Sequence, residues 1–177
     1  MSIKDVTKMG NPVLRKVAEL VKPSDIKTPE FQSLLQDMFD TMKAQTGIGI
    51  AAPQINVAKQ VALIEVSDDN PRYEGAGNSK LYTIINPIIS VLDQDKQGFW
   101  EGCLSVPGLR GFVERPKKIQ VEFLNEQGVE ETLVLEGFLS TVFQHEIDHL
   151  FGKLYIDRIS DLSQLSYFDE YEKFHLE

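Results

Sequence analysis

The residues best suited to chemistry lie at positions 144–150, where the sequence reads Gln-His-Glu-Ile-Asp-His-Leu. The preceding residues, 137–143, favour a helix. Residues four apart on a helix share one face, so His145 and His149 direct their imidazole rings toward one point. Glu146 lies beside that point, where it can handle a proton rather than bind a metal. The pattern predicts a metal site that activates water.

A solvated helix with incidental histidines is the alternative. The pattern His-Glu-x-x-His arises by chance in well under about one in a hundred chains of this size. Two of the three histidines of this chain fall inside it, and the third is His175. The metal site is therefore the favoured interpretation, although the motif itself lacks a third ligand.

Cys103 is the best candidate for the third ligand. It is the only cysteine, it follows a glycine in a segment that resembles a strand, and a thiolate binds late or borderline divalent metals well. A buried small residue is the alternative role for this cysteine. Carboxylates follow the motif, but none has a spacing that recommends it as a ligand: Asp157, Asp161, Asp169 and Glu170. The ligand set Cys103, His145 and His149 is favoured, which leaves an open position for water.

Composition limits the class of protein. With 177 residues, the chain is expected to be a single domain spanning 1–177. A net charge of −9 argues against direct nucleic-acid binding and against an anionic membrane surface. The sequence contains no apolar run long enough to span a bilayer and no signal peptide, so we expect a cytoplasmic protein without a membrane partner.

The elements that must position these residues indicate an α+β domain. A helix is predicted from Thr28, an N-cap followed by Pro29, to about Gly47. One apolar stripe runs along it: Phe31, Leu34, Leu35, Met38, Phe39 and Met42. The segment 137–150 is apolar over most of its first half, so the metal-binding helix is predicted to be central and buried.

Between these helices the sequence alternates as strands of an antiparallel sheet with one solvated face do. Strands are predicted at 61–66, 82–87, 88–92, around Cys103, 112–113, 119–124 and 132–135. Residues 67–80 are expected to be a polar loop, 125–128 a hairpin turn, and Pro87 a strand end or edge. A C-terminal helix is expected to begin near Asp161. The predicted fold is α+β, with mainly antiparallel sheets around a central buried helix carrying the His-Glu-x-x-His motif and a C-terminal helix or tail at 161–177.

Three blocks of the sequence together resemble the signature motifs of the peptide deformylases. They are Gly-Ile-Gly-Ile-Ala-Ala-Pro-Gln at 47–54, Glu-Gly-Cys-Leu-Ser at 101–105, and the motif at 144–150. The resemblance extends from about Met9 to Ser160. It implies a hydrolase that removes the formyl group from the N-terminal formylmethionine of nascent proteins. It also implies one divalent metal ion per chain, with Fe²⁺ as the expected native ion and Zn²⁺, Ni²⁺ or Co²⁺ as alternatives.

The resemblance also assigns roles to residues. Cys103, His145 and His149 would hold the metal, and Glu146 would take a proton from water and pass it to the departing amine. The Gln54 side-chain amide and the Leu104 backbone N–H would stabilise the oxyanion. The remaining substrate-binding residues would be Ile48, Gly49, Phe99, Gly102, Arg110, Phe138, Thr141 and Val142.

Among these, Gly49 would let the peptide pair as an added strand. Five would form the methionine pocket, with core packing as the alternative: Ile48, Phe99, Phe138, Thr141 and Val142. Arg115 would pair with Glu101 and brace the cysteine segment. Asp148 is predicted to orient a ligand histidine, with a solvated surface position as the alternative.

The tail after Ser160 departs from some relatives. Their basic C-terminal helix docks on ribosomal RNA, whereas this tail is acidic and would be repelled by phosphates. We therefore do not expect the tail to support ribosome association. It is expected to pack on its own domain through Leu162, Leu165 and Phe168.

Two other functions use the same residues. A metallopeptidase would use the same helix, but the cysteine ligand and the block ending in Gln54 favour a deformylase. A metal-stabilised structural domain would need a fourth ligand, and only His175 is spare.

Overall fold

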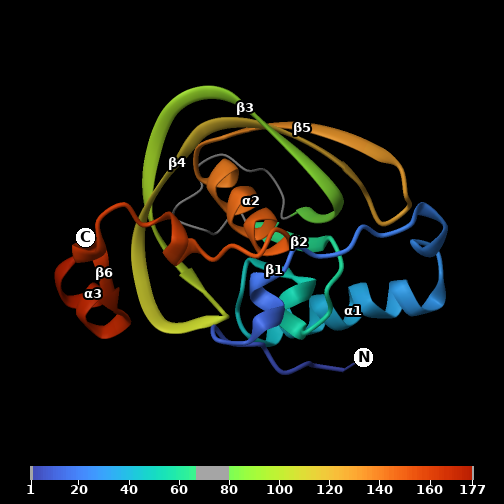
Figure 1. Cartoon of the computed structure of the whole chain (residues 1–177), viewed down its shortest axis with the longest axis horizontal. Helices are drawn as coiled ribbons and strands as arrows, with labels where there is room; N and C mark the ends of the chain where they lie inside the picture. The colour runs from blue at the N-terminus through green and yellow to red at the C-terminus, as the bar shows by residue number, and fades with distance from the viewer. Residues whose placement is uncertain (1, 67–79, 177) are drawn as a thin grey trace.

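The helix α2 (Gly137–Leu150) lies at the centre of the molecule, and the strands of one sheet curve around it (Figure 1). This computed structural model describes residues 2–66 and 80–176. Every residue of α2 from Phe138 to Leu150 is buried. The α+β class and the central buried helix predicted from the sequence are therefore confirmed.

Helix α1 (Pro29–Ala44) begins where the sequence predicts it. The Thr28 hydroxyl accepts a hydrogen bond from the Phe31 N–H at 3.3 Å, which satisfies one of the free donors of the first turn. Its predicted stripe packs against β1 and β2, with four residues buried and Leu34 and Phe39 partly buried. The predicted end at Gly47 is wrong: the helix ends at Ala44, and Thr46, with φ of 53°, is the residue in the left-handed conformation.

All strand pairs in the described residues are antiparallel, in the order β1-β2-β3-β4-β5, with β6 also paired to β4. The strands are β1 (Gly49–Ala51), β2 (Val61–Val66), β3 (Lys80–Cys103), β4 (Val106–Leu124), β5 (Glu130–Glu136) and β6 (Leu165–Tyr167). Short 3-10 helices lie at Pro12–Arg15, Pro23–Asp25, Ala52–Ile55, Tyr155–Arg158 and Leu162–Gln164.

The long hairpin β3–β4 replaces several shorter strands of the sequence prediction. Pro87 does not end a strand, because the register shifts between Ile85 and Ile88 and this bulge accommodates the missing N–H. Pro107 lies inside β4 near its start, rather than breaking the strand. The predicted turn at 125–128 joins β4 to β5, with the Gly128 N–H donating to the Asn125 carbonyl at 2.9 Å.

The buried apolar side chains form two main groups on either side of β1 and β2. One group lies between α1 and these strands and includes Met38, Ile50 and Leu63. The other lies between α2 and the sheet and includes Phe143 and Ile119. Helix α2 is thus held on one side by apolar packing, and its histidines approach the end of the β3–β4 hairpin.

The C-terminal segment differs from the single helix predicted from Asp161. A 3-10 turn is followed by β6 and then by α3 (Phe168–Phe174), which lie together at one side of the molecule (Figure 1). Of the residues expected to pack on the domain, Leu165 and Phe168 contact it through β6 and a ring contact, whereas Leu162 is 71% exposed.

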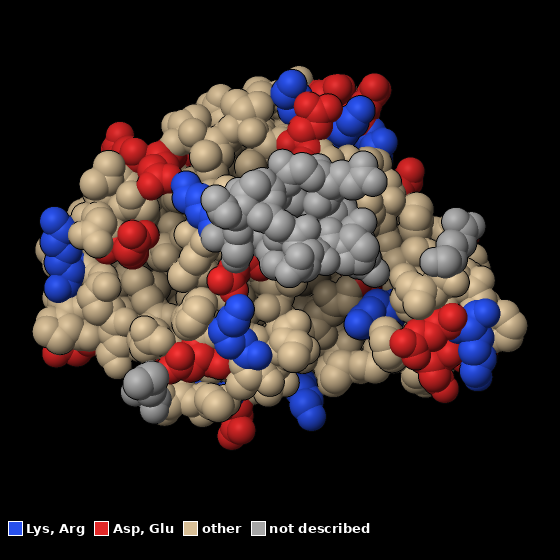
Figure 2. Space-filling model, turned by 180° about the vertical axis from the view of Figure 1, so that it is seen from behind, with Lys and Arg blue, Asp and Glu red and all other residues tan. Residues whose placement is uncertain are grey.

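Charges are dispersed over the surface. On the face shown in Figure 2, coloured Lys and Arg side chains stand beside Asp and Glu side chains rather than forming a broad basic area. The polar loop predicted at 67–80 lies outside the described residues, apart from Lys80, which opens β3. None of the helices in the described ranges is long and apolar enough to cross a bilayer.

Candidate active site

A cavity of about 830 Å³ lies between the N-terminal half of α2, the strand β1 and the tip of the β3–β4 hairpin. Its walls include the motif residues His145 and Glu146, the sulfur-bearing Cys103, and Gln54. The three sequence blocks at 47–54, 101–105 and 144–150 therefore meet at one cavity although they are far apart in the chain.

The three predicted metal ligands converge. Ligand atoms of Cys103, His145 and His149 all lie within 4.8 Å of one another, and all three residues are buried. The Cys103 Sγ lies 3.4 Å from the His149 Nε2. Cys103 is the last residue of β3, directly before the two-residue connection to β4, so the hairpin tip carries the sulfur to the helix.

The charge balance of this cluster favours a deprotonated sulfur. Burial opposes the thiolate, but His149 and His145 outweigh burial and hold the pKa of Cys103 well below its usual value. Burial likewise opposes a charged His145, but Cys103 and Glu101 hold its pKa well above the usual value. A thiolate and two imidazoles within reach of one point are a fitting donor set for a borderline divalent ion with an open coordination position.

Glu146 faces the same cavity without a protein partner for one oxygen. Its Oε2 is buried and has no hydrogen-bond partner among the described residues. Burial raises the pKa of Glu146, which is the change that suits a group exchanging protons near neutral pH. A Cβ atom on Gly49 would lie 2.3 Å from the Glu146 Oε1, so only glycine leaves room for this carboxylate.

Gln54 is oriented by contacts at both ends of its amide. Its Oε1 accepts from the Ala51 N–H at 2.8 Å, and its Nε2 lies 3.5 Å from the Cys103 Sγ and 3.2 Å from the Ser105 Oγ. The side chain is only 2% exposed. The amide donor is therefore fixed beside the ligand cluster. Leu104 lines the same cavity.

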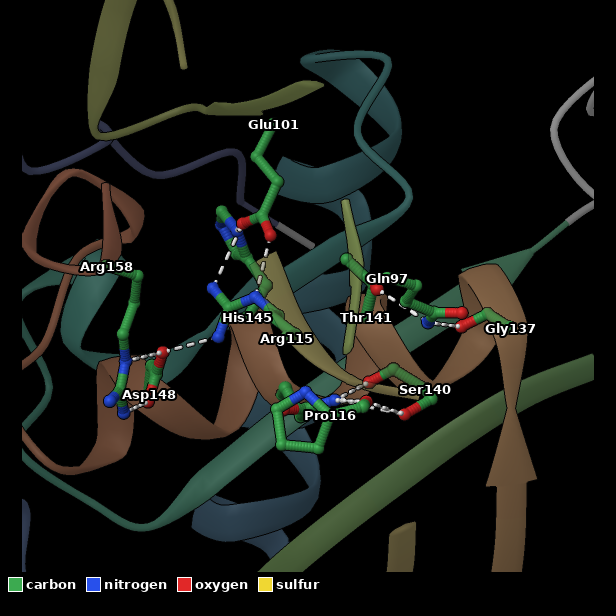
Figure 3. Close-up of polar contacts among 11 residues, drawn as sticks. Gln97, Glu101, Arg115, Pro116, Gly137, Ser140, Thr141, His145, Asp148 and Arg158 are labelled. Carbon is green, nitrogen blue, oxygen red and sulfur yellow. Dashed lines mark hydrogen bonds and ion pairs between the residues drawn. The ribbon is translucent and has the colours of Figure 1, made fainter. Parts of the chain in front are cut away.

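A chain of buried charges supports the ligand His145 (Figure 3). The His145 Nδ1 lies 2.7 Å from the Glu101 Oε2, which fixes the ring and leaves Nε2 for the metal. Arg115 donates to both oxygens of Glu101, at 2.6 and 3.0 Å, so the predicted pairing is present. Arg115 also donates to Asp148 at 2.8 Å, and Asp148 accepts from Arg158.

The prediction that Asp148 orients a ligand histidine is therefore wrong. Asp148 binds the guanidinium groups of Arg115 and Arg158, and the residue that contacts the His145 ring is Glu101. The helix places Asp148 three residues after His145, on a side that faces Arg115 rather than the imidazole. The alternative of a solvated surface position is wrong as well, because Asp148 is 9% exposed.

Most of the predicted substrate residues line the cavity. They are Ile48, Gly49, Gly102, Arg110, Phe138, Thr141 and Val142. Phe99 is not among the lining residues of the described chain. Its ring packs edge-on against Phe138 with centroids 5.4 Å apart, so it supports the pocket from behind. Gln97 adds a second support, because its Nε2 bonds to the Gly137 carbonyl and the Thr141 hydroxyl (Figure 3).

Sequence reasoning missed several residues at this cavity. Trp100 lines it, Ser105 holds Gln54, and the ring of Tyr155 stacks on His145 with centroids 6.1 Å apart. Ser105 is the last residue of the cysteine block and Trp100 directly precedes that block, and these positions were the available signal. Tyr155 follows the motif by six residues without any pattern that identifies it.

Comparisons with known proteins agree with this geometry. A family model described as polypeptide deformylase matches residues 3–165. The chain is 46% identical over 167 residues to a peptide deformylase of Leptospira biflexa serovar Patoc, covering 94% of this chain and 93% of the relative. It is 44% identical over 172 residues to peptide deformylase 1 of Prochlorococcus marinus, covering 97% and 88%.

The fold is also similar to that of a solved structure. It is a Met-Ala-Ser-bound class I type b peptide deformylase from Acinetobacter baumannii, which superposes with a TM-score of 0.82 at 35% identity and covers 89% of this chain and 99% of its own. The similarity thus spans nearly the whole length of each protein.

Proposed function

The chain belongs to the polypeptide deformylase family, and from this premise we propose which of its residues carry out the reaction. It is a hydrolase that removes the N-formyl group from the N-terminal formylmethionine of nascent proteins. The family is metal dependent, and Cys103, His145 and His149 form a cluster that fits a metal. The observation that carries the proposal is this convergence of one thiolate and two imidazoles beside a buried carboxylate.

Cys103, His145 and His149 hold the ion in this proposal. A divalent cation at this position supplies Lewis-acid chemistry, because it acidifies water and polarises a carbonyl group. Glu101 fixes the His145 ring through the 2.7 Å contact at Nδ1, which leaves Nε2 for the ion. The described residues around the cluster offer no fourth protein ligand, which leaves room for substrate.

Glu146 moves the proton. Its carboxylate accepts a proton from the attacking water while the water oxygen bonds to the formyl carbon. It then donates that proton to the peptide nitrogen as the C–N bond breaks, so formate and a free amine leave. The raised pKa that burial gives Glu146 suits both halves of this transfer.

Gln54 and Leu104 stabilise the negative charge that develops on the formyl oxygen. The Gln54 amide is held in place before substrate arrives, because Ala51 and Ser105 fix both of its ends. A donor oriented in advance is worth more than one that must turn during the reaction. Leu104 directly follows the ligand Cys103 at the hairpin tip and lines the cavity, so its N–H is proposed to lie beside the formyl oxygen.

The peptide binds along β1. This strand is at the end of the sheet order, and Gly49 lines the cavity, so an extended peptide can add beside it with main-chain hydrogen bonds. The methionine side chain enters the apolar part of the cavity on α2. The residues proposed to contact it are Ile48, Phe138, Thr141 and Val142 on the cavity wall, with Phe99 behind Phe138.

Fe²⁺ is the proposed native ion, with Zn²⁺, Ni²⁺ and Co²⁺ as alternatives that the same donor set accepts. The decisive experiment is anaerobic purification with metal analysis and a formate-release assay on formyl-Met-Ala-Ser. We expect one ion per chain and formate release without internal peptide cleavage. Activity of the freshly isolated enzyme that is indifferent to air would contradict iron, and internal cleavage would indicate a peptidase.

The wider setting is also part of the proposal. We place the chain as a single catalytic domain over 1–177, acting in the cytoplasm on nascent formylmethionine peptides. Direct nucleic-acid binding is not expected from a net charge of −9. The acidic C-terminal residues give no electrostatic support for docking on ribosomal RNA.

A further inference from the structure

The C-terminal segment reaches the active-site hairpin directly. Strand β6 pairs antiparallel with β4, with Leu109 opposite Tyr167 and Gly111 opposite Leu165. Helix α3 follows at once and buries Tyr171, which is 4% exposed. Residues 165–175 are therefore attached to the strand that follows the metal-ligand Cys103. From here on, "the tail" means these residues alone, rather than the whole segment 161–177.

Aromatic and cationic contacts tie the tail to two residues of the cavity wall. The Trp100 ring lies 5.1 Å from the Tyr171 ring and 4.7 Å from the His175 ring, measured between centroids. The Arg110 guanidinium lies 4.6 Å from the centre of the Phe168 ring, at the distance of a cation–π contact.

The two wall residues lie on the two strands of the hairpin that carries the metal ligand Cys103. Trp100 precedes Cys103 by three residues on β3, and Arg110 lies on β4, where its guanidinium packs over Gly102. A Cβ atom on Gly102 would lie 2.2 Å from the Arg110 Nη1, so the glycine is what lets the guanidinium lie flat there. The metal site and the proposed methionine pocket use neither side chain.

We propose that the tail is a positioning element that holds Trp100 and Arg110 as the wall on which the enzyme binds the third and later residues of the formylmethionine peptide. The inference rests on the proposed function and names the part of the substrate that this wall contacts. An indole ring and a guanidinium suit the extended backbone and side chains of a peptide, since one gives apolar area and the other donates to carbonyl oxygens. Phe168, Tyr171 and His175 are positioning residues, because they act through the wall.

Substrates of two lengths separate this role from a general structural one. The enzyme is assayed with formyl-Met-Ala and with formyl-Met-Ala-Ser-Lys, after Phe168→Ala, His175→Ala and the double substitution. We expect KM for the longer peptide to rise about threefold to tenfold, from the size of exposed cation–π and ring contacts. KM for the dipeptide, kcat for both and the metal content should stay within about twofold of wild type, on the same scale.

The tail offers a matched control. Phe174 is on the same helix and is 72% exposed, so Phe174→Ala removes an equal ring without touching the wall in the described structure. It should leave both KM values unchanged. Phe168→Tyr keeps a ring under Arg110 and should restore the KM of the longer peptide.

Trp100 is the only tryptophan of the chain, so its fluorescence reports on the wall. Emission should shift in His175→Ala but not in Phe174→Ala, and titration with the tripeptide Met-Ala-Ser should change it. This titration needs no turnover, so it tests the wall even if formate release fails and the proposed function falls.

Two results would overturn the inference. One is an equal KM change for both peptide lengths in Phe168→Ala and His175→Ala. The other is an emission shift in His175→Ala that leaves both the KM of the longer peptide and the affinity for Met-Ala-Ser at wild-type values.

Discussion

Two ion pairs contribute carboxylates to the same cavity and differ in almost every physical respect. Glu101 and Arg115 lie next to the ligand residue His145, with side chains 5% and 3% exposed, and share two hydrogen bonds. Lys43 and Glu65 lie at the rim, with side chains 55% and 20% exposed and one contact at 2.7 Å. Both Glu101 and Glu65 line the cavity wall.

The difference in burial gives the two ion pairs different roles. A buried pair loses much of its attraction to desolvation, so its value lies in geometry and in what its loss leaves uncompensated. Here it holds a ligand histidine at 2.7 Å. The rim pair is screened by water and contributes little. We call the ligand residues, Glu146, Gln54 and the Glu101–Arg115 pair the inner region, and the Lys43–Glu65 pair the rim. Single substitutions in the inner region should cause large losses of activity or stability, and substitutions at the rim should cause small ones.

The largest effect should come from Glu146→Gln, which removes the proton carrier of the inner region. We expect kcat to fall about 10²- to 10⁴-fold with the metal content unchanged, because Glu146 is not a ligand. Formate release and metal analysis measure the two quantities. Glu65→Gln makes the same chemical change at the rim and should keep activity within about threefold, as expected for an exposed pair. A comparable loss in both variants would remove the distinction between the regions.

Arg115→Met should cost the next largest amount, about 3–5 kcal/mol of the free energy of unfolding. The substitution leaves Glu101 and Asp148 buried without their shared cation. Denaturant unfolding of the metal-loaded protein measures it. A loss below 1 kcal/mol would show that Arg158 and His145 suffice to compensate the two carboxylates.

Gln54→Ala should raise the activation barrier by about 3–4 kcal/mol, a loss of about 10²–10³ in kcat. KM should change little, because the amide acts on charge that develops only in the transition state. Steady-state kinetics on a formyl-Met peptide tests this. A rise in KM at constant kcat would instead assign Gln54 to substrate binding.

The smallest effect should come from the rim itself. Lys43→Met is expected to cost about 0–1 kcal/mol of stability. That difference from wild type should disappear in about 1 M salt, where the screening length falls to about 3 Å. Parallel denaturant titrations at low and high salt measure it, and a loss that persists at high salt would show that Lys43 contributes through packing.

The sequence predicts the ligands and the proton carrier far better than the residues that hold them in place. His145, Glu146 and His149 follow from helical spacing, and Cys103 from being the only thiol in the chain. Trp100 and Tyr155 could not be identified, because their roles depend on ring contacts with Tyr171 and His145 that no local sequence pattern encodes. Asp148 was assigned the wrong partner for a similar reason: its side chain meets an arginine on β4, and no local pattern encodes that approach.

The fold was predictable where one residue type dictates the backbone. Thr28 and Pro29 mark a helix start, and Asn125 to Gly128 mark a turn, for local reasons. The continuity of β3 and β4 was not, since bulges let Pro87 remain inside a long strand. The C-terminal segment was misassigned as one helix because pairing of β6 with β4 overrides its local preference.

The pairing of β6 with β4 also sets an order of assembly during synthesis. All three proposed ligands precede residue 150, and the hairpin that brings Cys103 toward α2 closes within that part of the chain. Leu109 must wait for Tyr167, 58 residues later, before its strand partner emerges from the ribosome. Because chains fold progressively from the N-terminus, the ion site can form on a nascent chain that still lacks the tail proposed to hold Trp100 and Arg110. The enzyme would thus form its ion site before it gains its full affinity for a long substrate.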